Sequence, residues 1–291
     1  MGVPMALNLA AAHDVAVYDK RRQGIDTLLA GGAHLISDPS GYGHLDVLFL
    51  CLPSADVVRH VLFDPVDGVV PRLKPGTTVV DTSTTEYGAT VEIAGKLTQA
   101  GLRFLDAPVS GMQKRAEDGT LTMMVGGDAD LFQLLHPAFS TMASKVLHMG
   151  DIGSGQLTKL INQLLFDINA AALAEILPLS SKLGINPEKV AEVVNSGTGR
   201  SYASEFFIPH VLNGVFDNGY PMNAAYKDLI SGADISARFK IPTPVLAAAT
   251  STYQQALLEG HGDKDKGAMI LVFERLLGVS FRNTPKVEKQ T

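Results

Sequence analysis

The residues best suited to acid–base chemistry lie on one predicted helix near the middle of the chain, in "GQLTKLINQ" at 155–163. Lys159 and Gln163 are four residues apart and therefore share one face of that helix. Most lysines near a helix start are solvated surface residues, but the neighbours of Lys159 are strongly apolar. A lysine in an apolar cleft has a lowered pKa and can exchange a proton with a substrate. A second cation, Lys227 in "YKDL", has Asp228 as a candidate partner.

Polar and apolar side chains that would suit a nucleotide follow two predicted strands. In "CLP", Leu52 and Pro53 would form an apolar wall for a nucleotide ring. In "DTST", Ser83 and Thr84 offer hydroxyls to a nicotinamide or a ribose. Because ligands of open parallel sheets bind at the carboxyl ends of the strands, both motifs are candidates for cofactor contact. Each motif alone is also compatible with an ordinary turn.

Asp19 follows the strand-like run "VAVY" and is a candidate for ribose recognition. A carboxylate at this position accepts hydrogen bonds from both ribose hydroxyls of NAD and repels the extra phosphate of NADP. The cations Lys20 and Arg21 weaken this preference, since they would accommodate a 2′-phosphate. We therefore predict NAD as the cofactor, with NADP possible, and a solvated turn aspartate is the structural alternative.

The turn "DAPVSG" at 106–111 is a candidate carboxylate site, because Ser110 offers a hydroxyl and Gly111 permits close backbone approach. The single cysteine, Cys51, excludes an intrachain disulfide and is interpreted as a small buried hydrophobic residue. The eight histidines show no metal-ligand spacing, so we predict no metal.

Two kinds of periodicity indicate the elements that position these residues. Strand-like and helical runs alternate over 1–149, which predicts a doubly wound, Rossmann-like α/β domain. The continuous apolar run "LDVLFLCLP" is typical of a strand buried on both faces of a parallel sheet. The remaining chain shows only helical patterns, beginning with a long apolar helix over about 155–183. We predict an all-helical substrate and dimerisation domain at 150–285 and a flexible tail at 286–291.

Composition excludes several classes of protein. The 291 residues carry a formal net charge of −6 and are 46% hydrophobic, and no basic run is long enough to follow nucleic-acid phosphates. We find no signal peptide and no stretch that predicts a membrane span, so we expect a cytoplasmic protein.

Taken in order, the motifs resemble the β-hydroxyacid dehydrogenase family, which includes 3-hydroxyisobutyrate and L-threonate dehydrogenases. "DAPVSGMQKRAEDGTLTMMVGG" is similar to the family's substrate signature, "GSGQLTKLINQ" to its catalytic helix, and "KDL" recurs downstream. The resemblance implies NAD(P)-dependent hydride transfer with a small 3-hydroxy acid. It also implies a homodimer or homotetramer formed through the helical domain.

The resemblance also implies roles for single residues. Lys159 would be the general acid and base, and Ser83, Lys227 and Asp19 would contact the cofactor. The substrate would contact residues in or next to the turn at 106–111 and residues on the helix that carries Lys159, namely Ser110, Gly111, Met112, Asn162 and Gln163.

Three departures from the family pattern bear on the substrate. Met112 replaces the second glycine of "SGG", Arg115 adds a cation, and Gln163 replaces the usual asparagine. Polyhydroxy acids of the glycerate, tartronate semialdehyde or threonate type therefore remain open beside 3-hydroxyisobutyrate. Two alternatives are an imine or ketone reductase, which usually lacks the lysine, and an inactive binding or oligomerising scaffold.

The opening "MGVPMALNL" resembles the family's first helix, with Gly2 in the place of the third glycine of G-x-G-x-x-G. The resemblance assigns cofactor contact to Gly2, Val3, Pro4 and Met5. The family's first strand and first two glycines have no counterpart, which a mis-assigned start or a short isoform would explain. We expect an interrupted sheet, with weaker NAD binding and lower stability than in a chain extended at its N-terminus.

Overall fold

The computed structural model describes residues 1–20, 24–37 and 39–283, with the side chains of 39 and 40 excluded. Its contacts divide the chain into two compact units, Met1–Lys159 and Leu160–Thr291.

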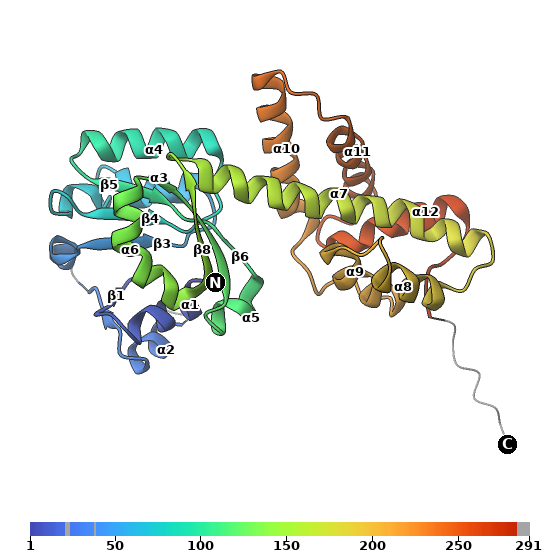
Figure 1. Cartoon of the computed structure of the whole chain (residues 1–291), viewed down its shortest axis with the longest axis horizontal. Coiled ribbons are helices and arrows are strands. Elements are labelled where there is room, and N and C mark those ends of the chain that lie inside the picture. The colour runs from blue at the N-terminus through green and yellow to red at the C-terminus, as the bar shows by residue number, and fades with distance from the viewer. Residues whose placement is uncertain (21–23, 38, 284–291) are drawn as a thin grey trace. The chain divides into compact units, whose positions relative to one another are not determined.

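The first unit alternates strands and helices around a mostly parallel sheet (Figure 1). Six strands form the main sheet in the order β3-β4-β5-β7-β6, with β8 paired to β7. Their bounds are β3 Val47–Leu50, β4 Thr78–Asp81, β5 Arg103–Asp106, β6 Val109–Ser110, β7 Leu121–Gly127 and β8 Ala143–Gly150. The helices are α1 Gly2–Ala10, α2 Ile25–Ala30, α3 Ala55–Phe63, α4 Tyr87–Gln99, α5 Met112–Glu117 and α6 Ala129–Met142.

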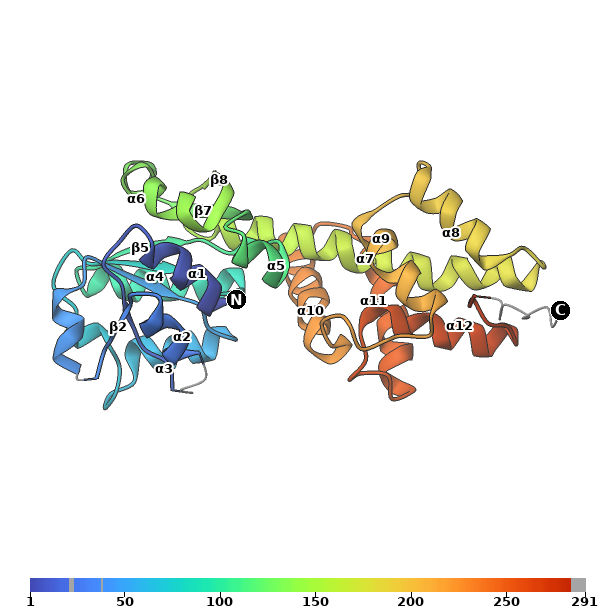
Figure 2. The same ribbon diagram turned by 90° about the horizontal axis from the view of Figure 1, so that it is seen from below.

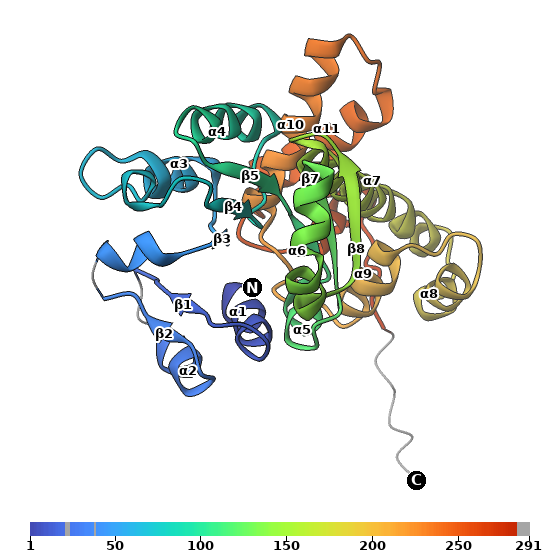
Figure 3. The same cartoon turned by 60° about the vertical axis from the view of Figure 1, so that its left-hand side comes forward.

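Helices cover both faces of this sheet, as Figure 3 shows for α3 and α4 on one side and α6 on the other. Neighbouring strand residues point to opposite faces, so Val79 packs beneath α3 and α4 while Val80 packs with α1 and α6. Phe104 and Leu105 of β5 also point to opposite faces, so that Phe104 packs in the cluster of Val79 and Leu105 in the cluster of Val80. The predicted doubly wound α/β architecture is therefore confirmed, and it brings the carboxyl ends of β3, β4 and β5 to one edge.

Three details differ from the sequence-based expectations. Val47, Leu48 and Phe49 are only half-buried, because β3 is an edge strand that pairs with β4 alone. The predicted single strand at 102–111 is two strands, since Pro108 lacks the N–H that a continuous ladder would need. Cys51, interpreted as a buried residue, is exposed. The sheet is in two parts, as expected: β1 (Ala16–Val17) and β2 (His34–Leu35) form a separate parallel pair.

The second unit is helical throughout its described residues, apart from one isolated bridge between Pro221 and Asp265. Helices pack around the long helix α7, and Figure 2 shows their arrangement within this unit. Their bounds are α7 Ser154–Lys182, α8 Pro187–Ser196, α9 Tyr202–Leu212, α10 Met222–Phe239, α11 Pro244–Leu258 and α12 Ile270–Leu277. Three short 3₁₀ turns complete the described structure: η1 Pro39–His44, η2 Val70–Arg72 and η3 Lys266–Met269.

The helix α7 begins in the first unit and continues through the second. In the described part of the chain it is the one helix with the length and apolar composition of a membrane span. Only 28% of its most apolar window is buried, because one side carries exposed aliphatic residues.

Candidate functional site

The start of α1 lies against the carboxyl end of β3. A Cβ added to Gly2 would be 3.6 Å from Cys51 Cβ, which is an ordinary contact, so space alone does not require glycine here. No side chain caps the first turn of α1. Its N–H groups and the positive end of the helix dipole suit an anion such as a pyrophosphate. Met5 is 3% exposed and belongs to the core, and its N–H donates to the Met1 carbonyl oxygen at 3.4 Å.

The loop after β4 is joined by hydrogen bonds to the loop after β3. The Leu52 N–H donates to Ser83 Oγ at 2.8 Å, and Thr82 Oγ1 donates to the Leu50 carbonyl oxygen. Ser83 is 3% exposed, whereas Leu52 is half-buried and Pro53 is exposed. The residues predicted to form the apolar wall and the predicted hydroxyl of Ser83 therefore lie side by side at this edge of the sheet.

The carboxylate of Asp106, at the end of β5, binds the first turn of α7. Gly153 N–H donates to Oδ1 at 2.7 Å, and Gln156 N–H donates to Oδ2 at 2.9 Å. Burial raises the pKa of Asp106, and these N–H bonds oppose that rise. A negative charge at a helix N-terminus is stabilised by the helix dipole. Asp106 therefore attaches α7 to the sheet.

Two glycines allow this attachment. A Cβ on Gly126 would lie 2.5 Å from Asp106 Oδ1, so the neighbouring strand β7 has no room for a side chain there. A Cβ on Gly155 would overlap the Met124 carbonyl oxygen and the Asp106 carboxylate. The backbone of α7 therefore packs directly against β5 and β7 at its start.

Lys159 lies on the second turn of α7 and is only 9% exposed. This burial disfavours the reading of Lys159 as an ordinary solvated lysine. The same helix carries Asn162 and Gln163, and Asn162 Nδ2 donates to Gln163 Oε1 at 3.3 Å. Asn162 is exposed and Gln163 is half-buried.

The candidate carboxylate turn spans β6 and the start of α5. Ser110 is half-exposed and pairs with Thr122 of β7. Gly111 has φ +141, and a Cβ there would be 2.9 Å from Arg115 Cβ and 3.0 Å from Leu121 Cδ2. Met112 has φ +60, a conformation that costs a non-glycine residue about 1–3 kcal/mol. The backbone of this turn is therefore strained, and it lies beside the aliphatic part of the Arg115 side chain.

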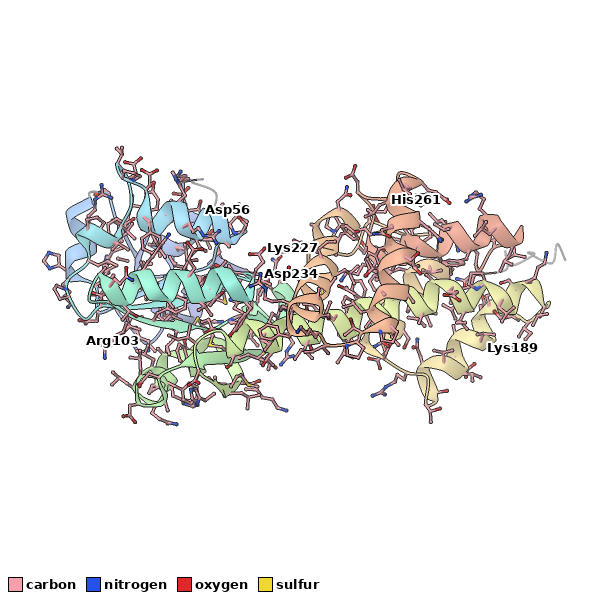
Figure 4. All side chains as sticks on the ribbon, turned by 90° about the horizontal axis from the view of Figure 1, so that it is seen from above. Asp56, Arg103, Lys189, Lys227, Asp234 and His261 are labelled. Carbon is pink, nitrogen blue, oxygen red and sulfur yellow. The ribbon has the colours of Figure 1, made fainter. Side chains whose placement is uncertain are left out.

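The remaining candidates are placed as follows. Asp19 is exposed two residues after β1, and Lys20 Nζ lies 3.5 Å from His60 Nε2. Arg21 lies outside the described residues. In the second unit, Lys227 lies on α10, on the same side of that helix as Asp234 (Figure 4). Across the described ranges, no group of three His, Cys, Asp or Glu side chains could hold a metal ion.

Asp81, beside Asp106 in the sheet register, gives a prediction about pH. Burial raises the pKa of Asp81 to about 6, although Ser83 donates hydrogen bonds to its carboxylate. The folded protein therefore binds this proton more tightly than the unfolded chain, whose aspartate pKa is about 4. The stability contributed by the protonated carboxyl is present below about pH 4 and is lost as the pH rises to about 6.

The substitution Asp81→Asn removes this dependence. Its free energy of unfolding should match that of the parent near pH 4 and exceed it by about 3 kcal/mol at pH 7, because an asparagine side chain cannot ionise. Urea titrations at both pH values measure the difference. A constant difference between the two proteins across this range would contradict the assignment.

Comparison with known proteins agrees with the fold and the motif order. Residues 1–150 match the family model for the NAD binding domain of 6-phosphogluconate dehydrogenase. Residues 153–273 match the model for the NAD-binding domain of NADP-dependent 3-hydroxyisobutyrate dehydrogenase. The fold and these two matches define a nicotinamide-dependent oxidoreductase.

The similarity extends along almost the whole chain. It is 36% identical to 2-(hydroxymethyl)glutarate dehydrogenase of Eubacterium barkeri, over 96% of this chain and 94% of that protein. Identity to the L-threonate dehydrogenase of Cupriavidus necator is 32%, over 94% and 92% of the two chains. A 3-hydroxyisobutyrate dehydrogenase structure from Salmonella typhimurium superposes with a TM-score of 0.82 at 33% identity, over 94% and 96% of the chains. The chain belongs to the β-hydroxyacid dehydrogenase family, and it is an NAD(P)-dependent hydroxy-acid dehydrogenase.

This membership also explains α7. Because the chain belongs to a family of soluble dehydrogenases, the apolar composition of α7 does not indicate a membrane span.

Sequence reasoning missed the residues that hold α7 in place. Asp106 and Gln156 were within the quoted motifs "DAPVSG" and "GSGQLTKLINQ" but received no role. The available signal was the polarity of these two residues. Each lies next to glycine or strand residues, in a segment that would be buried, and a buried segment excludes a polar side chain that has no role there.

Proposed function

We propose that the chain interconverts a small 3-hydroxy acid and its aldehyde or ketone, with Lys159 as the general acid and base. One observation carries the proposal: Lys159 is a buried lysine one turn beyond a helix start that the Asp106 carboxylate holds. A bound nicotinamide coenzyme would supply hydride transfer to and from the carbon that bears the hydroxyl.

Lys159 would accept or donate the proton that accompanies this hydride transfer. In oxidation, its neutral amine accepts the hydroxyl proton at Nζ while the carbon–oxygen double bond forms. In reduction, the ammonium returns that proton to the oxygen. Low exposure favours this exchange, because it keeps bulk water from competing for the proton.

Ser110 and Gly111 would hold the substrate carboxylate, and Asn162 and Gln163 would supply amide hydrogen bonds to the substrate. Ser83, Leu52 and Pro53 would border the nicotinamide side of the cofactor, with Gly2, Val3, Pro4 and the backbone of Met5 near its phosphates. Asp19 would bind a ribose, and Lys227 would contact the cofactor from α10. These assignments rest on the motif positions and on the exposures given above.

A substrate panel tests the proposal. It contains 3-hydroxyisobutyrate, glycerate, threonate, tartronate and 2-(hydroxymethyl)glutarate, each with NAD and with NADP. The last acid is included because a relative carries its name and because Arg115 adds a cation beside the carboxylate turn. We expect reduction of coenzyme, followed by its near-ultraviolet absorbance, with at least one acid. Failure with every acid of the panel and both coenzymes would contradict the proposal.

We also propose that two copies associate through the exposed side of α7. Ile161, Leu165, Ile176 and Leu179 repeat at helical spacing, and Leu183 follows the helix. Their exposed fractions lie between 48% and 68%. A contiguous apolar stripe of this length is typical of an interaction surface, and a second copy would cover it with an identical stripe.

The double substitution Leu165→Glu/Ile176→Glu should convert the oligomer to a monomer, because it places charges inside the apolar contact. Light scattering after size exclusion measures the mass. Leu134→Glu, which changes a 65% exposed leucine on α6, is the matched control and should leave the mass unchanged. A parent protein that is monomeric at all concentrations, or a double variant with unaltered mass, would refute this interface.

A further inference from the structure

A single side chain on α7 joins the helix of Lys159 to the loop after β4. Gln156 Nε2 donates to the Ser83 carbonyl oxygen at 2.7 Å, and the Thr85 N–H donates to Gln156 Oε1 at 3.1 Å. Both ends of the amide are therefore engaged with the backbone of one loop. Gln156 is 2% exposed, so water does not compete for these bonds.

The same residue is fixed from the other side by its own backbone, which donates to Asp106 Oδ2. Ser83 in turn accepts from the Leu52 N–H. The loops after β3 and β4, the end of β5 and the first turn of α7 thus form one hydrogen-bonded network. Lys159 lies three residues beyond Gln156, less than one helical turn away.

We infer that Gln156 is a positioning residue, which sets the distance between the Lys159 amine and the nicotinamide bordered by Ser83. This inference rests on the proposed function of Lys159 and Ser83. Proton and hydride must leave the same alcohol group, so the Lys159 amine and the nicotinamide ring must be held at a fixed distance and orientation relative to each other. Displacements of about 1 Å in such an arrangement can cost about 10²-fold in rate.

The substitution Gln156→Leu tests the inference, because leucine is similar in size and makes neither hydrogen bond. We expect kcat to fall about 10–100-fold, while the Kd for coenzyme, measured by calorimetry, changes by no more than about threefold. Gln133→Leu, at an exposed glutamine of α6, is the matched control and should retain the parent kcat.

The substitution Gln156→Glu supplies a readout that a purely structural role would not produce. An ionised carboxylate can accept from the Thr85 N–H but repels the Ser83 carbonyl, whereas a protonated carboxyl restores both bonds. The ratio of its kcat to that of the parent should therefore rise as the pH falls. Asp81, Asp106 and Lys159 also lie near this network and are present in both proteins, so the ratio to the parent, rather than kcat alone, is the readout.

The outcomes separate the two proposals. If the parent protein turns over no hydroxy acid, the proposed function fails. If the parent is active and folded Gln156→Leu keeps the parent kcat, the positioning role is wrong. If Gln156→Leu does not fold, a pH-independent ratio for Gln156→Glu overturns the inference instead.

Discussion

Replacing Lys159 with methionine should lower kcat by about 10³-fold while coenzyme binding is retained. General acid–base catalysis contributes about 10²–10⁴-fold, and methionine keeps the length of the side chain but cannot exchange a proton. Lys159→Arg should be equally impaired, because a guanidinium stays protonated at every accessible pH. Steady-state turnover with the best acid of the panel gives kcat, and calorimetry gives the Kd for NAD or NADP.

The exposed Lys145 on β8 provides the matched control. Lys145→Met removes one lysine from the same unit and should retain the parent kcat. Full activity in Lys159→Met would show that another group carries the proton, and the residue roles would then need reassignment. A large loss of coenzyme affinity would instead place Lys159 in cofactor binding.

A second large effect is expected in the core of the helical unit. Asp167 of α7 forms an ion pair with Lys266 of η3, and both side chains are almost completely buried. Lys266 Nζ also lies 4.5 Å from the centre of the Phe166 ring. Burial raises the pKa of Asp167 to about 6, although the nearby Lys266 opposes the rise.

Removing one partner should be costly, because the other charge stays buried without compensation. We expect Asp167→Ala and Lys266→Met each to lower the free energy of unfolding by about 3–5 kcal/mol at pH 7. The double substitution Asp167→Ala/Lys266→Met should cost only about 1–2 kcal/mol, mainly from lost packing. Urea unfolding followed by circular dichroism in the far ultraviolet provides the comparison.

The surface pair Lys114–Asp118 on α5 is the matched control for this prediction. Lys114→Met should leave the free energy of unfolding nearly unchanged, since the pair is exposed. Additive losses in the Asp167/Lys266 double variant would mean that the two charges do not compensate each other.

The architecture was predictable because it follows from local patterns. Buried strands such as Thr78–Asp81 read as continuous apolar and β-branched runs, and α7 as a long helical run. The sequence does not show which strand lies at the edge of the sheet, so the partial exposure of Phe49 was not predicted. Whether a strand is central or at an edge depends on neighbours that are distant in the sequence.

The candidate site was predictable to the level of its motifs but not of its connections. The bonds of Gln156 join residues 71 and 73 positions apart, and no spacing rule reveals such a pair. The Asp167–Lys266 pair spans 99 positions. Its one signal was an aspartate inside the apolar run "LLFDINAA", which requires a buried partner whose identity only the fold supplies.

Transfer of deuterium tests the central claim most directly. The hydroxy acid that reacts fastest in the panel would be labelled with deuterium at the carbon that bears the hydroxyl, and the coenzyme would be analysed by mass spectrometry after turnover. We expect the label in the reduced nicotinamide ring, because the hydride passes directly between carbon atoms. Unlabelled reduced coenzyme with deuterium in the solvent, or oxidation of the acid without coenzyme reduction, would contradict the account.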